Sequence, residues 1–251
     1  MPEHATGERP YTLLSCGISL DGYLDAGTDQ RLLLSNAADL DRVDGLRASC
    51  DAILVGAATV RHDNPRLLVR SAARRAERVA LGASPTPMKV TVTRRADLDP
   101  EADFFTAGEP DKIVYCARSA LGRARRRLGA VATVVDGGRQ VDLRRVGEDL
   151  HRRGVRRLMV EGGGCVHTQL LTADLVDELQ LVVAPLFVGD ARAARFVGEG
   201  RFPFHPGRRA TLEEVRPIGD VVLLRYALSS RFISSAGTPR PGSARLQEPA
   251  R

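Results

Sequence analysis

The 251-residue chain has no tryptophan, only 4% aromatic residues, and just two lysines among its 37 basic residues. Scarce aromatic rings argue against a groove that stacks nucleic-acid bases. Its four cysteines include no CxxC pair, so we expect neither a disulfide framework nor a bound metal. No apolar run approaches the roughly 20 residues of a membrane helix, and the N-terminus lacks the apolar core of a signal peptide. We therefore expect a cytoplasmic protein that binds no membrane.

Two common nucleotide-binding patterns are also missing. The sequence contains no GxxxxGK[ST] segment, which disfavours a P-loop nucleoside triphosphatase. Its glycine-rich segment, VEGGGCVHTQLL at 160–171, departs from the dinucleotide pattern GxGxxG, because His167 stands where the last glycine belongs. A standard Rossmann domain is therefore not indicated.

The net charge of +6 comes almost entirely from arginine. The densest basic run, RARRR at 123–127, has no interleaved aromatic residues and predicts the solvated face of a short helix. We expect no nucleic-acid partner. An RNA-binding role is a distant alternative, and it would show a steeply salt-dependent affinity for polynucleotides.

The glycine-rich segment is the strongest local signal in the chain. Gly162, Gly163 and Gly164 lie between an apolar run and a predicted helix. Glycine adopts positive φ and lets the backbone approach a ligand, and the positive end of a helix favours a phosphate. A tight turn without a ligand is the alternative. The segment favours a phosphorylated cofactor.

Apolar strand-like runs alternate with helical segments, which predicts an α/β fold with a mostly parallel sheet. The predicted strands are 11–16, 52–56, 89–93, 112–116, 131–135, 157–161, 178–184, 211–216 and 221–228, and the predicted helices are 38–49, 119–128, 143–153 and 165–173. Pro217, Gly219 and Asp220 mark a hairpin between the last two strands, so the sheet should be mixed and end in an antiparallel pair. We expect a flexible N-terminus (1–9), a single domain (10–228) and a disordered tail (229–251) rich in Ser, Pro, Gly and Arg.

Two more polar clusters follow predicted strands, SLDGYL at 19–24 and GAATVRHDNPRLLVR at 56–70. Ligands of open α/β sheets bind at the carboxyl ends of strands, so these clusters and the glycines should converge on one cleft. The second cluster supplies a hydroxyl (Thr59), a carboxylate (Asp63) and two cations (Arg66 and Arg70). A capped turn before Pro65 explains any one of them equally well.

The ordered set SLDG, DAILVGAATV, DNPRLLVR, VEGGG and LVDELQL resembles the reductase domain of the bifunctional riboflavin-biosynthesis deaminase-reductase family. The resemblance spans about residues 11–228. It implies a three-layer fold like dihydrofolate reductase, with helices on both faces of the sheet. The zinc motifs of the deaminase half, HxE and PCxxC, are absent from the sequence, so the chain resembles a stand-alone reductase.

The resemblance implies NADPH-dependent reduction of 5-amino-6-(5-phosphoribosylamino)uracil, with hydride delivered to C1′ of the ring-opened sugar. The family's cofactor positions fall on Ile18, Thr59, Asp63, Gly162, Gly163, Gly164, Cys165, Val166, His167, Thr168 and Gln169, and Arg94 stands near the expected cofactor ribose. Its substrate positions fall on Arg47, Leu67, Arg70 and Glu161. Asp63 is the leading catalytic candidate, as an orienting or proton-relaying group, and Cys165 is interpreted as a small buried packing residue.

The chain departs from the family at the expected substrate pocket. Leu33, Leu34 and Ser35 replace a Trp-Ile-Thr pattern, Arg31 replaces a serine, and Arg94 with Arg95 replaces an Asp-Ser pair. These two arginines suit a 2′-phosphate, although exposed loop cations are the alternative. Reduction of a pterin, folate or specialised metabolite therefore stays open, as does a non-catalytic nucleotide-binding role. NADH or a deazaflavin could replace NADPH.

The resemblance also implies a homodimer that pairs through the sheet edge near the C-terminal strands. The apolar run LQLVVAPLFV at 179–188 would be an aggregation risk as a bare edge. We expect this run to be covered by a second copy.

Overall fold

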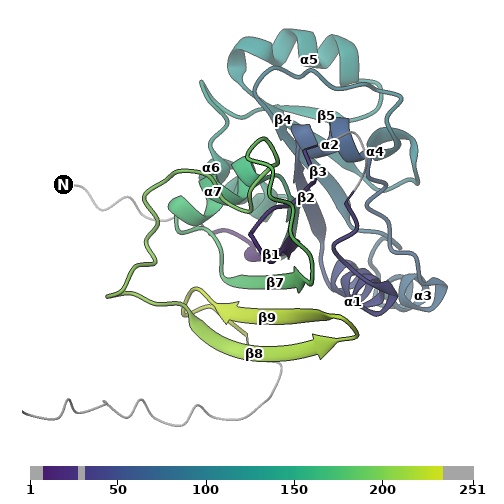
Figure 1. Ribbon diagram of the computed structural model, residues 1–251. Helices are drawn as coiled ribbons and strands as arrows, with labels where there is room; N and C mark the ends of the chain where they lie inside the picture. The colour runs from purple at the N-terminus through teal and green to yellow at the C-terminus, as the bar shows by residue number, and fades with distance from the viewer. Residues whose placement is uncertain (1–7, 28–31, 234–251) are drawn as a thin grey trace, which may run out of the picture.

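The computed structural model describes residues 8–27 and 32–233. Nine strands form one sheet in the order β5-β4-β3-β2-β6-β1-β7-β9-β8 (Figure 1). In chain order they are β1 (Tyr11–Ser19), β2 (Ala52–Gly56), β3 (Met88–Thr93), β4 (Lys112–Cys116), β5 (Thr133–Asp136), β6 (Arg157–Gly162), β7 (Glu178–Ala184), β8 (Thr211–Ile218) and β9 (Val221–Ala227). The strands from β5 to β7 are parallel, whereas β9 is antiparallel to both β7 and β8. The predicted mixed sheet with a C-terminal hairpin is confirmed.

Helices cover both faces of the sheet and make three layers. They are α1 (Ala37–Ala48), α2 (Ala57–Asp63), α3 (Ala72–Ala80), α4 (Asp103–Thr106), the 3-10 turn η1 (Arg118–Ala120), α5 (Leu121–Leu128), α6 (Leu143–Arg152) and α7 (Gly164–Thr172). One apolar core packs α6 and α7 on β1, β2 and β6, and another packs α1, α2, α4 and α5 on the opposite face. The strand β2 is buried along its whole length, as its continuous run AILVG predicts for a central parallel strand.

Three helices escape the sequence pattern: α2, α3 and α4. The segment of α3 was predicted to be an irregular surface connection. It has the N-cap Ser71, but its buried face carries Arg78 where an apolar residue would signal a helix. The guanidinium of Arg78 donates to the carbonyls of Ala48, Cys50 and Ser84 at 2.7 Å each. A cation therefore replaces the apolar stripe that the sequence pattern requires.

Both predicted flexible ends contain residues that contact the sheet. Arg9 donates to both oxygens of Asp177, at 2.6 and 2.8 Å, and Ser229 donates to the same carboxylate at 2.6 Å. Arg231 also contacts Asp177, at 3.3 Å. The predicted boundaries at 9 and 229 are therefore wrong, because Asp177 holds residues on both sides of the domain. The rest of both segments, 1–7 and 234–251, lies outside the described residues, as does Arg31.

Two adjacent carboxylates at the start of β7 are buried and fully hydrogen-bonded. Asp177 also accepts from the backbone N–H of Thr12, at 2.8 Å. Glu178 accepts from Tyr11, Gln180 and Arg225 at 2.6, 2.7 and 2.5 Å. Burial acts to raise the pKa of each carboxyl, but these donors outweigh burial and both pKa values lie below their ordinary range. The ionised carboxylates tie β1 and β9 to β7.

We predict that Asp177→Asn lowers the free energy of unfolding by about 3–5 kcal/mol at neutral pH, because it leaves buried cations without their charge partner. A carboxyl with a lowered folded pKa stabilises above its unfolded value of about 3.9 and loses that contribution as pH falls through the folded value. The variant should therefore lose stability less steeply than wild type under acid. Urea unfolding at neutral and acid pH measures both effects. The control is Asp190→Asn, which removes a surface pair with Arg192; an equal loss there would contradict the account.

Candidate active site

A cleft of about 1590 Å³ opens along the carboxyl ends of β1, β2, β3 and β6. The three polar segments of the sequence reach this cleft, as their positions after strands predict. The predicted site residues that line it are Thr59, Asp63, Arg94, Glu161, Gly162, Gly163, Gly164, Cys165, Val166, Thr168 and Gln169. The structure therefore brings most of the predicted cofactor positions together on one wall.

The glycine turn between β6 and α7 lies against the turn between β2 and α2. Gly163 has φ +97°, and a Cβ there would lie 3.4 Å from Thr59 Oγ1. A Cβ on Gly164 would lie only 2.4 Å from the carbonyl oxygen of Arg195. No side chain caps the amino end of α7, and its first turn contains no acidic residue. Backbone donors and the positive helix end therefore face a cleft that has room for an anion.

Three residues of α7 have surroundings that the sequence does not reveal. Thr168 donates to the Gly164 carbonyl at 2.6 Å and accepts from the Gly198 N–H at 2.8 Å, so its hydroxyl holds the turn together. His167 is fully buried and lies outside the cleft lining, with Nδ1 3.2 Å from the Phe196 carbonyl. Burial lowers the pKa of His167 to about 4, against the opposing effect of that carbonyl. Cys165 is exposed, so its interpretation as a buried packing residue is wrong.

Glu161 and Arg47, predicted separately, form one bidentate ion pair. Arg47 Nε and Nη2 each lie 2.6 Å from a Glu161 oxygen, and Nη1 donates to the Leu68 carbonyl at 3.2 Å. Burial acts to lower the pKa of Arg47, but the charge and hydrogen bonds of Glu161 outweigh it and the pKa is raised. Only Glu161 lines the cleft, so Arg47 orients that carboxylate from behind.

Ile18, Leu67 and Arg70 also lie outside the cleft lining. Leu67 is buried in the core and has φ +49°, so any contact with a ligand would come from its backbone. The guanidinium of Arg70 donates to the carbonyl of Leu40, which does line the cleft, at 2.8 Å. Arg70 is thus at the rim beside α1.

Sequence reasoning missed a strap, residues 190–200, that forms part of the cleft wall. It belongs to the long connection between β7 and β8, drawn in green in Figure 1. Its backbone pairs with the turn after β1, since Leu24 N donates to Ala194 O at 2.7 Å and Asp25 accepts from Ala194 N at 2.9 Å. Arg192 and Arg195 bring cations to the lining. The strap has no periodic pattern, so the sequence carries no signal for it.

Within the described ranges, no group of three or more His, Cys, Asp or Glu side chains could hold a metal ion. The same residues include no helix that is long and apolar enough to cross a membrane. The densest arginine run lies on α5 with exposed side chains, as predicted.

The chain is similar to two archaeal enzymes along almost their whole length. It is 37% identical over 225 residues to the 2,5-diamino-6-ribosylamino-4(3H)-pyrimidinone 5′-phosphate reductase of Archaeoglobus fulgidus, covering 89% of this chain and 99% of the relative. It is 34% identical over 221 residues to the protein of the same name from Methanothermobacter thermautotrophicus, covering 88% and 99%.

Solved structures share the fold at lower identity. A pyrimidine reductase-like protein from Corynebacterium diphtheriae matches with a TM-score of 0.72 and 22% identity, over 87% of this chain and 91% of that one. The riboflavin biosynthesis reductase Rib7 of Saccharomyces cerevisiae matches with a TM-score of 0.63 and 20% identity, over 91% and 93%. The model of the RibD C-terminal domain matches residues 10–224. The chain therefore belongs to the RibD C-terminal domain family.

Proposed function

We propose that this protein is an NADPH-dependent reductase of a phosphorylated ribosylamino-pyrimidine in riboflavin biosynthesis. The observation that carries the proposal is the glycine turn of α7 and the Glu161 carboxylate on one wall of the same cleft. The two archaeal relatives support the diamino-pyrimidinone 5′-phosphate as substrate, whereas the sequence motifs alone favoured the aminouracil phosphate. They also favour a pyrimidine over a pterin or folate.

The residues at the glycine turn fit a dinucleotide cofactor. Side chains on Gly163 and Gly164 would enter the contact between the turns, and α7 is uncapped. We infer that the backbone there binds the pyrophosphate of NADPH, with Thr59 and Thr168 fixing the turn. When bound, NADPH would supply a hydride to the electrophilic sugar carbon, and the chain's task is to orient the two partners and exclude water.

The opposite end of the cleft suits the substrate. Leu33, Leu34, Ser35 and Leu40 line it with mainly apolar surface, and the side chain of Leu33 is 67% exposed there. We infer that the pyrimidine lies on this surface, with its amino groups donating to Glu161 and its phosphate at the rim near Arg70.

Asp63 is the proposed polar catalytic residue. It is the last residue of α2, and it lines the cleft between the glycine turn and the turn after β3. Reduction of an imine adds a hydride to carbon and a proton to nitrogen, while the nicotinamide is oxidised. A carboxyl at this position is suited to orient the substrate or to relay that proton.

We also propose a homodimer that forms through β8. The expected edge was the run at 179–188, but β7 pairs with both β1 and β9 and is therefore interior. The edge of the described sheet is β8, where Leu212 and Val215 are 50% and 57% exposed. An unpaired apolar edge favours pairing with a second copy. Sedimentation that finds a stable folded monomer at low micromolar protein would contradict this assembly.

The function predicts NADPH oxidation when purified protein meets the diamino-pyrimidinone phosphate. Initial rates with this compound, the aminouracil phosphate and dihydrofolate, followed by nicotinamide absorbance, measure it. We expect the highest kcat/KM with the diamino compound. Turnover of dihydrofolate alone, or of none of the three despite NADPH binding, would contradict the proposed substrate.

For Gly163→Val we predict a rise of about tenfold or more in the Kd of NADPH, because the branched side chain occupies the turn and disfavours φ > 0. Titration of protein fluorescence or calorimetry measures the Kd. The matched control is Gly154→Val, which imposes the same strain at φ +92° where nothing lies within 4 Å. If both variants bind NADPH as wild type does, the glycine turn is structural only.

For Arg70→Ala we predict a large rise in KM for the substrate, on the order of 2–4 kcal/mol in kcat/KM, with NADPH affinity retained. The phosphate would lose a charge-assisted hydrogen bond. Arg66→Ala is the control, because Arg66 is exposed and pairs with Asp103. Equal weakening of substrate and NADPH by Arg70→Ala would show that the two ends of the cleft are assigned wrongly.

A further inference from the structure

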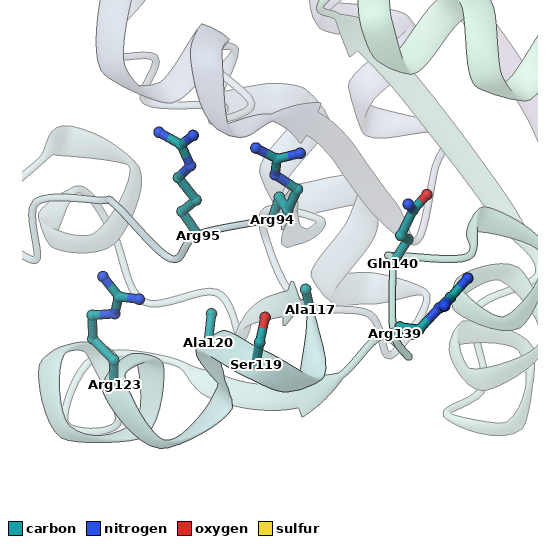
Figure 2. Close-up of a pocket in the computed structure, with 8 residues that line it drawn as sticks. All are labelled: Arg94, Arg95, Ala117, Ser119, Ala120, Arg123, Arg139 and Gln140. Atoms are coloured by element: carbon teal, nitrogen blue, oxygen red, sulfur yellow. The ribbon is translucent and has the colours of Figure 1, made fainter.

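A second hollow of about 510 Å³ adjoins the cleft at the carboxyl ends of β3 and β4. Its lining is strongly basic and comes from three separate turns: Arg94, Arg95, Ala117, Ser119, Ala120, Arg123, Arg139 and Gln140. Figure 2 shows Arg94 and Arg95 rising from one turn, Arg123 pointing toward that turn from α5, and the Ser119 hydroxyl facing the same space, whereas Arg139 points away. Three guanidinium groups and a hydroxyl therefore surround one hollow.

These three arginines lack acidic partners. Across residues 8–27 and 32–233, Arg94, Arg95 and Arg123 make no ion pair or side-chain hydrogen bond, whereas nearby Arg118 pairs with Asp136 at 2.8 Å and Arg127 donates to the Leu98 carbonyl at 2.7 Å. Like charges gathered without a counter-charge repel each other. An anion in the hollow would remove that cost.

The turn that carries two of the arginines is fixed by its own contacts. Ala96 is fully buried at φ +54°, and its N–H donates to Thr93 Oγ1 at 3.1 Å. Arg94 and Arg95 lie between these two anchors and project outward. The backbone of the site is therefore formed before any ligand arrives.

The position of the hollow relates it to the cofactor. Arg94, Arg95 and Gln140 line both the hollow and the main cleft. In the sheet order, β3 and β4 are two and three strands from β6, or roughly 10–15 Å from the glycine turn at the usual strand spacing. A ribose and a base fit between a pyrophosphate at the turn and an anion in the hollow.

We propose that Arg94, Arg95 and Arg123 bind the 2′-phosphate of NADPH, so that Arg123 on α5 determines the preference for NADPH over NADH. This rests on the proposed function, which supplies the dinucleotide. A phosphomonoester carries nearly two negative charges at neutral pH and three acceptor oxygens, and the guanidinium fork matches them. NADH lacks this group and leaves the three cations unpaired.

The test is calorimetric titration of NADPH and NADH into wild type, Arg123→Ala and Arg126→Ala. Arg126 is an exposed arginine of the same helix that does not line the hollow, so its loss matches the change in net charge. Arg123→Ala should weaken NADPH by about ten- to hundredfold and leave NADH unchanged, while Arg126→Ala changes neither by much. Inorganic phosphate should compete with NADPH in wild type and not in Arg123→Ala.

Equal loss of NADPH affinity in the two variants would overturn the site and indicate only a general positive field. Equal affinity of wild type for NADPH and NADH, with turnover of the pyrimidine by both, would overturn the site and leave the proposed function standing. Binding of NADPH through Arg123 without turnover of any pyrimidine would support the site and overturn the proposed function.

Discussion

The close approach of three backbone segments, around Gly56, Gly163 and Gly164, is the constraint on which the cleft depends. A Cβ on Gly56 would lie 3.1 Å from Val166, and one on Gly164 would meet the carbonyl of Arg195 at 2.4 Å. Side chains here would separate the ends of β2 and β6 and lift the strap from α7. The same absence of side chains leaves the amino end of α7 accessible, so packing and anion binding have one cause.

Charge is treated differently inside the fold and around the cleft. Asp177 and Glu178 are buried with several donors each, and Glu161 is held by both nitrogens of Arg47. The arginines of the neighbouring hollow have no such partners in the part of the chain that the structure describes. The excess positive charge is therefore concentrated where a phosphorylated ligand would bind, which accounts for a basic protein with few aromatic residues.

The sequence predicts the sheet well, because its strands are continuous apolar runs and the hairpin has clear turn residues. It misses α3 because Arg78 occupies the buried face, and it misses the strap because that segment has no period. Of the site, the sequence predicts which segments meet, since strand ends fix this. It cannot predict that Arg47 and Glu161 bind each other, that the Thr168 hydroxyl is used internally, or that Arg123 faces Arg94, because these depend on distant segments.

The most direct test of the central claim is to follow the hydride itself. NADPH carrying deuterium at C4 of the nicotinamide would be incubated with the protein and the diamino-pyrimidinone phosphate, and the product examined by NMR. The account predicts one deuterium at C1′ of an opened ribityl chain. Deuterium in the heterocycle, or a product without deuterium while NADPH is consumed, would contradict the account.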